Sequence, residues 1–379
     1  MPQIDNFLRL MNHRGASDLH FAIGNPPVLR VSGGLEPIRY KTLSENDFDV
    51  MIAEITPKPL WDRYKATGDI DFAYETPGLA RFRVNLFRQE RGPAAVFRII
   101  PTRLFTLDQL GMPRILEKLT KYPSGLALVT GPTGSGKSTT LSALVDLVNA
   151  ERNVHILTIE DPIEFVHPPK SALITQREVG SSAVDFAEAL RAGLREDPDI
   201  ILVGEMRDLE TVQLALHAAG TGLLVLGTLH TNNAAKTIDR ITSVFPADEQ
   251  EGARAMVADC LVGVVSQQLL RRKEGGRVAA LEIMFGSPAL GTLIRDGKTH
   301  HIPNLIMQGK NRGMITMDQS LFDLVKADIV DPEDAYGKAV YKPEFRHKML
   351  EEMSIRVGLA DEDPAETERA LALLTGQKT

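Results

Sequence analysis

The sequence has 379 residues, of which 43% are hydrophobic and 25% are charged, so the chain is long enough for about two or three globular domains with a sizeable core. The formal net charge of −7 disfavours a protein that coats nucleic acid with a basic surface, and the single cysteine, Cys260, excludes an intrachain disulfide and fits a reducing cytosol. Apolar runs stay shorter than the roughly 18–20 residues of a membrane helix, and the first residues lack the pattern of a secretion signal, so we expect any membrane association to come through a partner.

Short helices and strands are expected at the start of the chain. Apolar residues at helical spacing predict a helix over residues 4–13. Ser44 can cap a second helix over residues 45–55, and Pro57 and Pro59 interrupt the pattern after it. Strands are expected over residues 18–23 and 28–31, with turns at residues 25–27 and 32–34.

Residues 69–100 alternate between apolar and polar side chains, as strands with one buried face do. The apolar face carries Phe82, Val84 and Leu86, and the opposite face carries Arg81, Arg83 and Asn85. A break at residues 89–93 divides the stretch and predicts an antiparallel hairpin. We therefore interpret residues 1–100 as a small mixed α/β domain.

Residues 101–113, with proline at both ends, are interpreted as a linker to a second domain over residues 114–354. Apolar runs in this domain alternate with helical segments, which is the pattern of a parallel sheet. The expected strands cover residues 125–130, 154–159, 199–204 and 223–229. The later expected elements are helices over 248–270, 288–296, 300–309 and 316–327 and a strand over 277–285. Residues 355–379 are interpreted as a polar tail or a loosely docked helix.

A phosphate-binding motif, G-x-x-x-x-G-K-[ST], joins the expected strand 125–130 to an expected helix over 139–150. The motif consists of Gly131, Pro132, Thr133, Gly134, Ser135, Gly136, Lys137 and Ser138. Its glycines let backbone N–H groups close around phosphates, Lys137 can reach the β- and γ-phosphates, and the Ser138 hydroxyl can ligate Mg²⁺. We therefore predict a site for ATP and Mg²⁺ at this helix N-terminus, with Thr139 as its last residue.

Carboxylates follow two of the expected strands. Glu205 ends the apolar run that starts at Asp199. Because ligands of parallel sheets sit at the carboxyl ends of the strands, we predict that Glu205 holds Mg²⁺ through water or orients the attacking water. Glu160, Asp161 and Glu164 follow the preceding strand, and such a cluster of anions beside a triphosphate favours a divalent cation. The spacing leaves open which carboxylate contacts metal or water, and a solvated turn is the alternative.

His230 follows the expected strand 223–229, where it could sense the γ-phosphate or couple the site to a neighbouring subunit; a structural role is the alternative. Arg83 and Arg98 of the expected hairpin are candidates for arginines supplied from elsewhere to stabilise transition-state charge, and a solvated charged face is the alternative. The adjacent pair His300–His301 faces different directions on a helix, so we do not expect it to bind metal.

The order of these motifs resembles the secretion ATPase (GspE/VirB-type) superfamily. The matching segments are Gly131–Ser138, Glu160–Phe165, Asp199–Asp208 and Gly227–Asn232. Within this superfamily the sequence is most similar to the type IV pilus retraction (twitching motility) ATPases of the PilT/PilU type. Secretion and pilus-assembly members typically carry a tetracysteine zinc element, which a chain with one cysteine cannot form.

The resemblance implies an α/β fold with a PAS-like N-terminal domain and a RecA-like P-loop NTPase core that ends in a helical C-terminal part. It also implies a catalytic set made of a Walker B glutamate, an Asp-box glutamate with its acidic neighbours, a His-box histidine and two arginines. In this sequence these are Glu205, then Glu164 with Asp161 and Glu160, then His230, and then Arg83 with Arg98.

Two positions depart from the family pattern. Leu223 stands where family His boxes usually have a histidine, and Gly291 replaces the first arginine of a C-terminal signature whose second arginine, Arg295, is kept. These departures suggest an auxiliary or divergent member of the retraction group.

The resemblance implies an ATP-hydrolysing homo-hexamer that drives pilus retraction and twitching motility. It implies an inner-membrane platform protein as partner, a paralogous retraction ATPase as a second one, and a cytoplasmic location at the inner face of that membrane. The alternatives are an export ATPase for secretion or conjugation, a nucleic-acid translocase on a RecA-like core, and a non-hydrolysing adaptor. The acidic balance of the chain disfavours the translocase.

Overall fold

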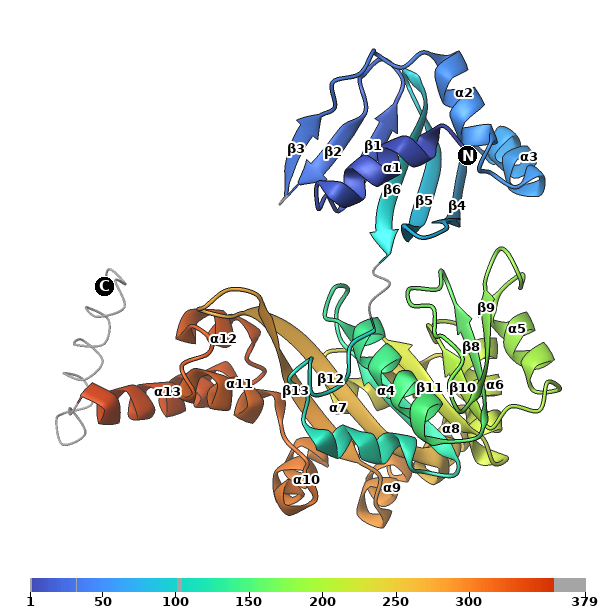
Figure 1. Cartoon of the computed structure of the whole chain (residues 1–379). Helices are drawn as coiled ribbons and strands as arrows, with labels where there is room; N and C mark the ends of the chain where they lie inside the picture. The colour runs from blue at the N-terminus through green and yellow to red at the C-terminus, as the bar shows by residue number, and fades with distance from the viewer. Residues whose placement is uncertain (1, 32, 101–103, 358–379) are drawn as a thin grey trace. The chain divides into compact units, whose positions relative to one another are not determined.

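The computed structural model describes residues 2–31, 33–100 and 104–357. The chain divides into two compact units (Figure 1), each a mixture of helices and strands as the sequence predicted. The first unit takes residues 1–104 together with 159–168 and 176–189, and the second takes 105–158, 169–175 and 190–379. Within the described ranges, no helix combines the length and the apolar character that a bilayer span requires.

The described part of the first unit holds a six-stranded sheet with the order β3-β2-β1-β6-β5-β4, in which neighbouring strands are antiparallel. Its strands are β1 (Asp18–Ala22), β2 (Val28–Val31), β3 (Gly34–Pro37), β4 (Asp69–Thr76), β5 (Ala80–Gln89) and β6 (Gly92–Ile100). Its helices are α1 (Ile4–His13), α2 (Glu45–Ala53) and α3 (Lys58–Thr67).

One face of this sheet is the core of the unit. Phe82, Val84 and Leu86 are fully buried, and burial alternates along β5, which confirms the predicted alternation. Helix α1 packs its apolar side on the same core and contacts β1 (Figure 1). Each such side chain contributes about 1.5–3 kcal/mol when it is taken from water.

Two expectations for this unit need correction. Residues 69–100 form β4, β5 and β6 and not a single hairpin, because the chain turns once more at Gly78, whose φ is 72°. Helix α2 ends before Pro57, as expected, but these prolines also start the unpredicted α3, with Pro59 in its first turn. A proline is tolerated there because the first N–H groups of a helix have no partner within the helix.

In the second unit, the described residues build a sheet with the order β13-β12-β7-β11-β10-β8-β9, in which β8 and β9 also carry residues of the first unit. Its strands are β7 (Gly125–Thr130), β8 (His155–Glu160), β9 (Leu173–Glu178), β10 (Ile200–Val203), β11 (Leu224–Leu229), β12 (Leu261–Arg271) and β13 (Arg277–Phe285). The pairs β10–β11, β11–β7 and β7–β12 are parallel. These strands confirm the predicted parallel sheet, with ends that shift by a residue or so.

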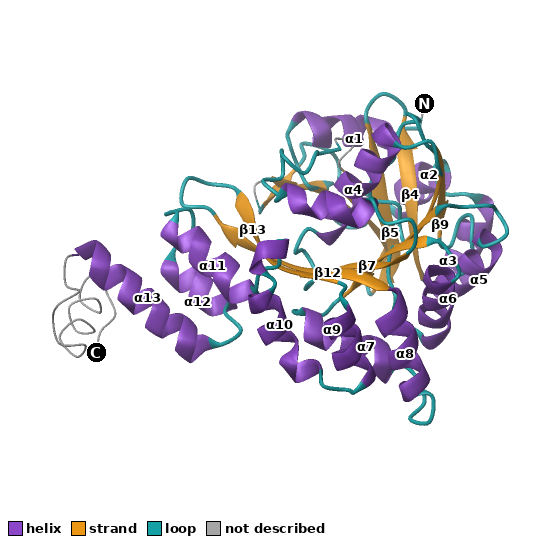
Figure 2. Cartoon of the chain, turned by 90° about the horizontal axis from the view of Figure 1, so that it is seen from below, coloured by secondary structure: helices purple, strands orange, loops and turns teal. Residues whose placement is uncertain are grey.

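Helices cover both faces of this sheet. The helices of this part of the chain are α4 (Lys137–Glu151), α5 (Phe186–Gly193), α6 (Leu209–Gly220), α7 (Ala234–Ser243), α8 (Gln250–Cys260), α9 (Pro288–Arg295), α10 (Ile302–Gln308), α11 (Met317–Lys326), α12 (Pro332–Lys338) and α13 (Lys342–Val357), with 3-10 turns at Arg114–Thr120, Thr299–His301 and Lys310–Arg312. Figure 2 shows α4 on one side of β7 and β12, and α7, α8 and α9 on the other. The central strands are therefore buried on both faces, which explains their continuous apolar sequences.

The predicted helix over residues 248–270 is wrong in its second half. Helix α8 ends at Cys260, and the chain continues directly as the strand β12. A strand buried on both faces has no alternation to distinguish it from a buried helix, and nearly every residue of β12 is buried. Gly263 fits here because a Cβ at this position would lie 2.6 Å from Leu119 and 3.1 Å from the Met284 carbonyl.

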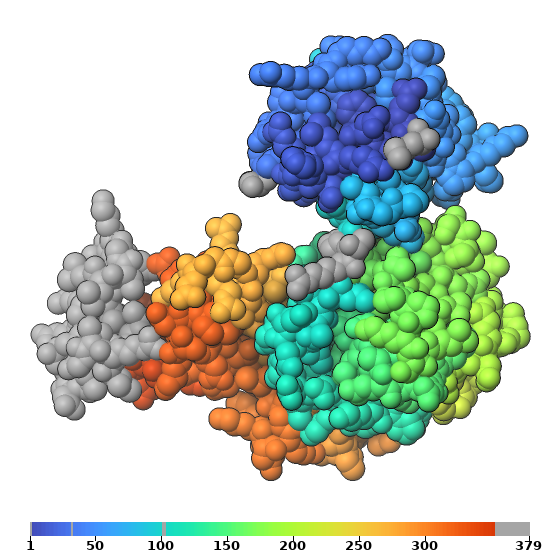
Figure 3. All heavy atoms as spheres, in the orientation of Figure 1, coloured from blue at the N-terminus to red at the C-terminus, as the bar shows by residue number. Residues whose placement is uncertain are grey.

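The C-terminal helices form a small core of their own beside β12 and β13. The predicted α11 and the unpredicted α12 and α13 bury Met317, Leu321 and Phe322 against Leu270 of β12. Figure 3 shows this region in orange and red at one end of the second unit. Helix α13 runs on to Val357, past the residue 355 at which a tail was expected to start, and the rest of the expected tail, residues 358–379, lies outside the described residues.

Candidate active site

The phosphate-binding motif forms a loop between β7 and α4, as the sequence predicted. Its glycines are required by its geometry. Gly131 has a φ angle of 147°, and a Cβ on it would lie 2.2 Å from the Gln267 carbonyl. Gly136 has a φ angle of 87°, and a Cβ on it would lie 2.8 Å from the Gln267 side-chain amide. Among the residues that the structure describes, no side chain caps α4, so its first N–H groups stay available to an anion.

The loop carries the donors that a polyphosphate needs. Lys137 is 9% exposed, and its Nζ donates to the carbonyls of Gly131 at 2.9 Å and Pro132 at 3.1 Å. The buried Ser135 hydroxyl has no hydrogen-bond partner among the described residues. A buried cation and an unpartnered hydroxyl beside a helix N-terminus fit the phosphates of a nucleotide, and the half-buried Ser138 hydroxyl fits a ligand of its Mg²⁺.

The structure brings together two of the predicted catalytic residues, Glu205 and His230. They follow the neighbouring parallel strands β10 and β11, and Nε2 of His230 lies 2.9 Å from Oε1 of Glu205. Arg207, which the sequence analysis missed, also donates through Nε to Oε1 of Glu205. The Glu205 side chain is 19% exposed, so the carboxylate is partly shielded and has two cationic or polar donors on one oxygen.

Hydrogen bonds hold the ends of these two strands in register. The Thr228 hydroxyl donates to the Gly204 carbonyl, and the Met206 N–H donates to the Thr228 carbonyl at 3.2 Å. Gly227 leaves room for Met206, because a Cβ on Gly227 would lie 2.6 Å from its sulfur. The loop that carries Glu205 is thus fixed on both sides of the carboxylate.

The acidic cluster, which begins at Glu160, the last residue of β8, is placed in the first unit, whereas the phosphate-binding loop, Glu205 and His230 are in the second. Asp161 and Glu164 are exposed, and Glu160 is half-buried with Oε1 accepting from the Gln176 side chain at 3.3 Å. The buried Glu178 accepts the Ile163 N–H at 3.0 Å and so shapes the loop between these acids. Their contact with metal or water stays a prediction.

The two predicted arginines lie opposite each other in the first unit, since Arg83 of β5 is in register with Arg98 of β6. Arg83 pairs with Asp71 at 3.4 Å, and Arg98 donates to the buried Asp18 at 2.7 Å. Burial acts to raise the pKa of Asp18, but hydrogen bonds from Ser17 and Arg98 outweigh it and hold that pKa below its usual value. Both guanidinium groups therefore already have a carboxylate partner, and their contact with a nucleotide stays a prediction.

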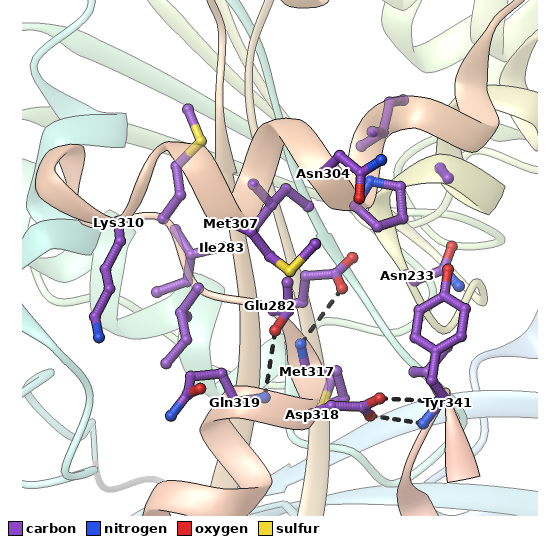
Figure 4. A pocket seen from close by; sticks show the side chains of 18 of the residues that line it. Asn233, Glu282, Ile283, Asn304, Met307, Lys310, Met317, Asp318, Gln319 and Tyr341 are labelled. Carbon is purple, nitrogen blue, oxygen red and sulfur yellow. Dashed lines mark hydrogen bonds between the residues drawn. The ribbon is translucent and has the colours of Figure 1, made fainter. Parts of the chain in front are cut away.

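A cavity of about 910 Å³ lies elsewhere in the second unit (Figure 4). Its lining includes Glu282 of β13, Met307 of α10 and Met317 of α11, and none of the residues of the phosphate-binding loop. Glu282 accepts the N–H groups of Ala234 at 2.8 Å and Met317 at 3.4 Å, which are the first residues of α7 and α11. Burial raises the pKa of Glu282 above its usual value, while the two N–H groups act against that shift.

A phosphate-binding loop between a buried parallel strand and a helix, with a glutamate at the end of a nearby strand of the same sheet, defines a P-loop nucleotide-binding protein. Residues 4–310 match the family model described as Type II/IV secretion system protein. The chain belongs to this family, as the motifs predicted.

Relatives with assigned names cover most of the chain. It is 49% identical over 342 residues to a protein named type IV pilus retractation ATPase PilT from Pseudomonas aeruginosa, with 90% of this chain and 99% of the relative covered. It is also 49% identical over 314 residues to a protein named twitching motility protein from Neisseria gonorrhoeae, with 83% and 84% covered. The crystal structure of the pilus retraction motor PilT with bound ADP matches with a TM-score of 0.86 and 40% identity, over 92% of this chain and 99% of that one.

Proposed function

We propose that this protein is the ATP-hydrolysing motor that drives type IV pilus retraction and twitching motility. The observation that carries the proposal is the phosphate-binding loop together with Glu205 fixed by His230 at the carboxyl end of the same sheet. The near full-length identity to a protein named as a retraction ATPase supports the choice of pilus retraction among the motors of the family.

The two units suggest that the chain consists of two domains with different roles. We infer a PAS-like domain over residues 1–100, a linker over 101–113, a RecA-like ATPase domain with C-terminal helices over 114–354 and a tail over 355–379. The separate antiparallel and parallel sheets support two domains, although residues 159–168 and 176–189 of the proposed second domain cluster with the first unit. In this proposal, Arg83 and Arg98 of the first domain exchange their aspartate partners for the phosphates of a nucleotide.

The residues of the second unit account for binding and turnover of ATP. Lys137 and the N–H groups at the start of α4 would hold the phosphates, and the hydroxyls of Ser138 and Thr139 lie at the same end of the helix, where Ser138 would hold Mg²⁺. Magnesium supplies neutralisation of phosphate charge when it is bound. Glu205 accepts a proton from the attacking water through Oε2, because Oε1 lies against His230 and Arg207.

The residues of the first unit complete the proposed site. Glu164, with Asp161 and Glu160, supports the metal or the water, and Arg83 with Arg98 neutralises charge that develops on the phosphates. A site completed by arginines of a neighbouring copy needs a head-to-tail interface, which closes into a ring, and we propose a homo-hexamer. The ring works at the cytoplasmic face of the inner membrane on a platform protein of the pilus, beside a paralogous retraction ATPase.

A deletion strain tests the direction of the motor. Cells that lack this protein are expected to carry more pili and to lose surface motility, and the wild-type gene, but not a Lys137→Ala gene, restores motility. Cells without pili would contradict retraction and support an assembly or export motor. If nucleic acid stimulated ATP hydrolysis by the purified protein, the result would instead support a translocase.

A further inference from the structure

Strand β12 carries a glutamine that reaches past the end of β7 to the phosphate-binding loop. The two strands are parallel, with Val265 beside Val129 and Ser266 beside Thr130. Thr130 is the last residue of β7, so the next residue of β12, Gln267, lies alongside the loop that follows. Gln267 is 1% exposed and is part of none of the motifs that identify the site.

Both ends of the Gln267 side chain are hydrogen-bonded to the loop and its helix. Nε2 donates to the Ser135 carbonyl at 2.6 Å, and Oε1 accepts from the Thr140 hydroxyl at 2.8 Å. Thr140 is fully buried in the first turn of α4. A side-chain amide cannot be turned around here, because a donor faces the carbonyl and an acceptor faces the hydroxyl.

The bond to Ser135 determines the direction of an N–H group in the loop. The Ser135 carbonyl and the Gly136 N–H belong to one planar trans peptide unit, in which the two groups point in opposite directions. Because Gln267 holds the carbonyl toward β12, the Gly136 N–H is directed away from β12, at the start of α4. That N–H is one of the donors that a phosphate at the helix N-terminus accepts.

We propose that Gln267 is a positioning residue for nucleotide binding: it holds the Ser135–Gly136 peptide in the orientation that binds the β-phosphate of a nucleoside di- or triphosphate. This role rests on the proposed nucleotide site, and it deepens that proposal by adding a residue that touches no ligand. The next glutamine, Gln268, offers a matched control. It is also buried, at 9% exposure, but its Nε2 faces the Lys338 carbonyl at 3.5 Å and not the loop.

Calorimetric titration of the full-length protein with MgADP tests the role. Gln267→Met removes both bonds at nearly constant volume and is expected to weaken MgADP binding about tenfold, the effect of roughly one lost hydrogen bond. Gln268→Met is expected to leave the affinity unchanged. In turnover assays, Gln267→Met is expected to raise the KM for ATP by about the same tenfold factor with little change in kcat, as loss of uniform binding does. Equal affinities of the Gln267→Met and Gln268→Met proteins would overturn the proposal.

A second variant decides the matter if Gln267→Met does not fold. Gln267→Glu keeps the acceptor for Thr140 but places a carboxylate oxygen against the Ser135 carbonyl. Its MgADP affinity, measured relative to wild type at each pH, is expected to recover as the pH is lowered, because a protonated carboxyl can donate to that carbonyl again. A ratio that does not change with pH would overturn the proposal. If wild type itself bound no MgADP, the proposed function would fail, whereas normal wild-type binding with unaffected Gln267 variants would remove only this role.

Discussion

Nε2 of His230 lies 2.9 Å from Oε1 of Glu205, although the two residues are separated along the chain by a helix and a strand. The contact joins the carboxyl ends of β10 and β11. His230 and Arg207 both contact Oε1, so together they determine the direction in which the second carboxylate oxygen points. This arrangement leads to the first two predictions.

Glu205→Gln removes the anionic acceptor and keeps the size of the side chain. We expect ATP turnover to fall by about 10²–10⁴-fold, the usual contribution of a general base, while MgADP binding is unchanged. Phosphate release and titration with MgADP measure the two effects. Glu210→Gln, at an exposed acid of α6 that pairs with Arg191, is the control and should keep full turnover. Near-normal hydrolysis by the Glu205→Gln protein would remove Glu205 from its role.

His230→Ala removes one of the two side chains that hold Oε1 of Glu205 and is expected to lower kcat about tenfold, which corresponds to about 1.4 kcal/mol of lost transition-state stabilisation. His230→Gln places an amide donor near the position of Nε2, so we expect it to restore part of the lost rate. Steady-state kinetics at saturating ATP distinguish the two variants. An alanine variant as fast as the glutamine variant would show that the contact does not affect catalysis.

Mixed rings test whether Arg83 acts on the site of a neighbouring copy. Arg83→Ala and Lys137→Ala subunits are each expected to be inactive alone, because one lacks the arginine and the other lacks the phosphate-binding lysine. In an equal mixture, about a quarter of head-to-tail interfaces combine an intact arginine with an intact loop, so activity should reappear. The absence of activity at every mixing ratio would contradict the role in trans. Arg63→Ala, at an exposed arginine of α3, serves as the control and should stay active alone.

Glu282 makes stability depend on pH in a defined direction. Burial raises its pKa in the folded state above the usual 4.5, so folding favours the protonated form. The stabilisation is therefore complete below pH 4.5 and is lost as the pH rises through the higher folded pKa. Urea unfolding of wild type and Glu282→Gln from pH 4 upward measures this effect. We expect wild type to lose stability relative to the variant as the pH rises, and a constant or opposite difference would contradict the assignment.

The parts of the site that depend on local sequence were predictable. The spacing of glycines and Lys137 identifies the loop, and the rule that ligands sit at the carboxyl ends of parallel strands places Glu205 and His230 at one edge of the sheet. The alternation along residues 81–86 identified the buried face of β5 in the same way.

The parts that depend on distant pairing were not predictable. Gln267 contacts Ser135 across 132 positions of the chain, and Asp18 holds Arg98 across 80. No periodicity connects such residues, because the partner is chosen by the pairing of strands. The predicted helix over residues 248–270 was wrong in its second half for a related reason. Both faces of β12 are buried, so its sequence lacks the alternation that marks a strand.

Leu223, which stands where related sequences usually have a histidine, lies far from His230. It directly precedes β11, whereas His230 directly follows it, so the two positions lie at opposite ends of the strand, about 20 Å apart at the usual rise per residue. A histidine at position 223 would therefore not reach Glu205, which His230 contacts.

In strand β12, Gln267 is hydrogen-bonded to the phosphate-binding loop, and Leu270, about 10 Å further along, packs in the C-terminal core. A minimal catalytic fragment that lacks α11 to α13 would lose Met317, Leu321 and Phe322, which pack beside this strand, and would expose the strand's apolar side chains to water. Engineered versions of this enzyme consequently have to retain the last helices, even where only its chemistry is wanted.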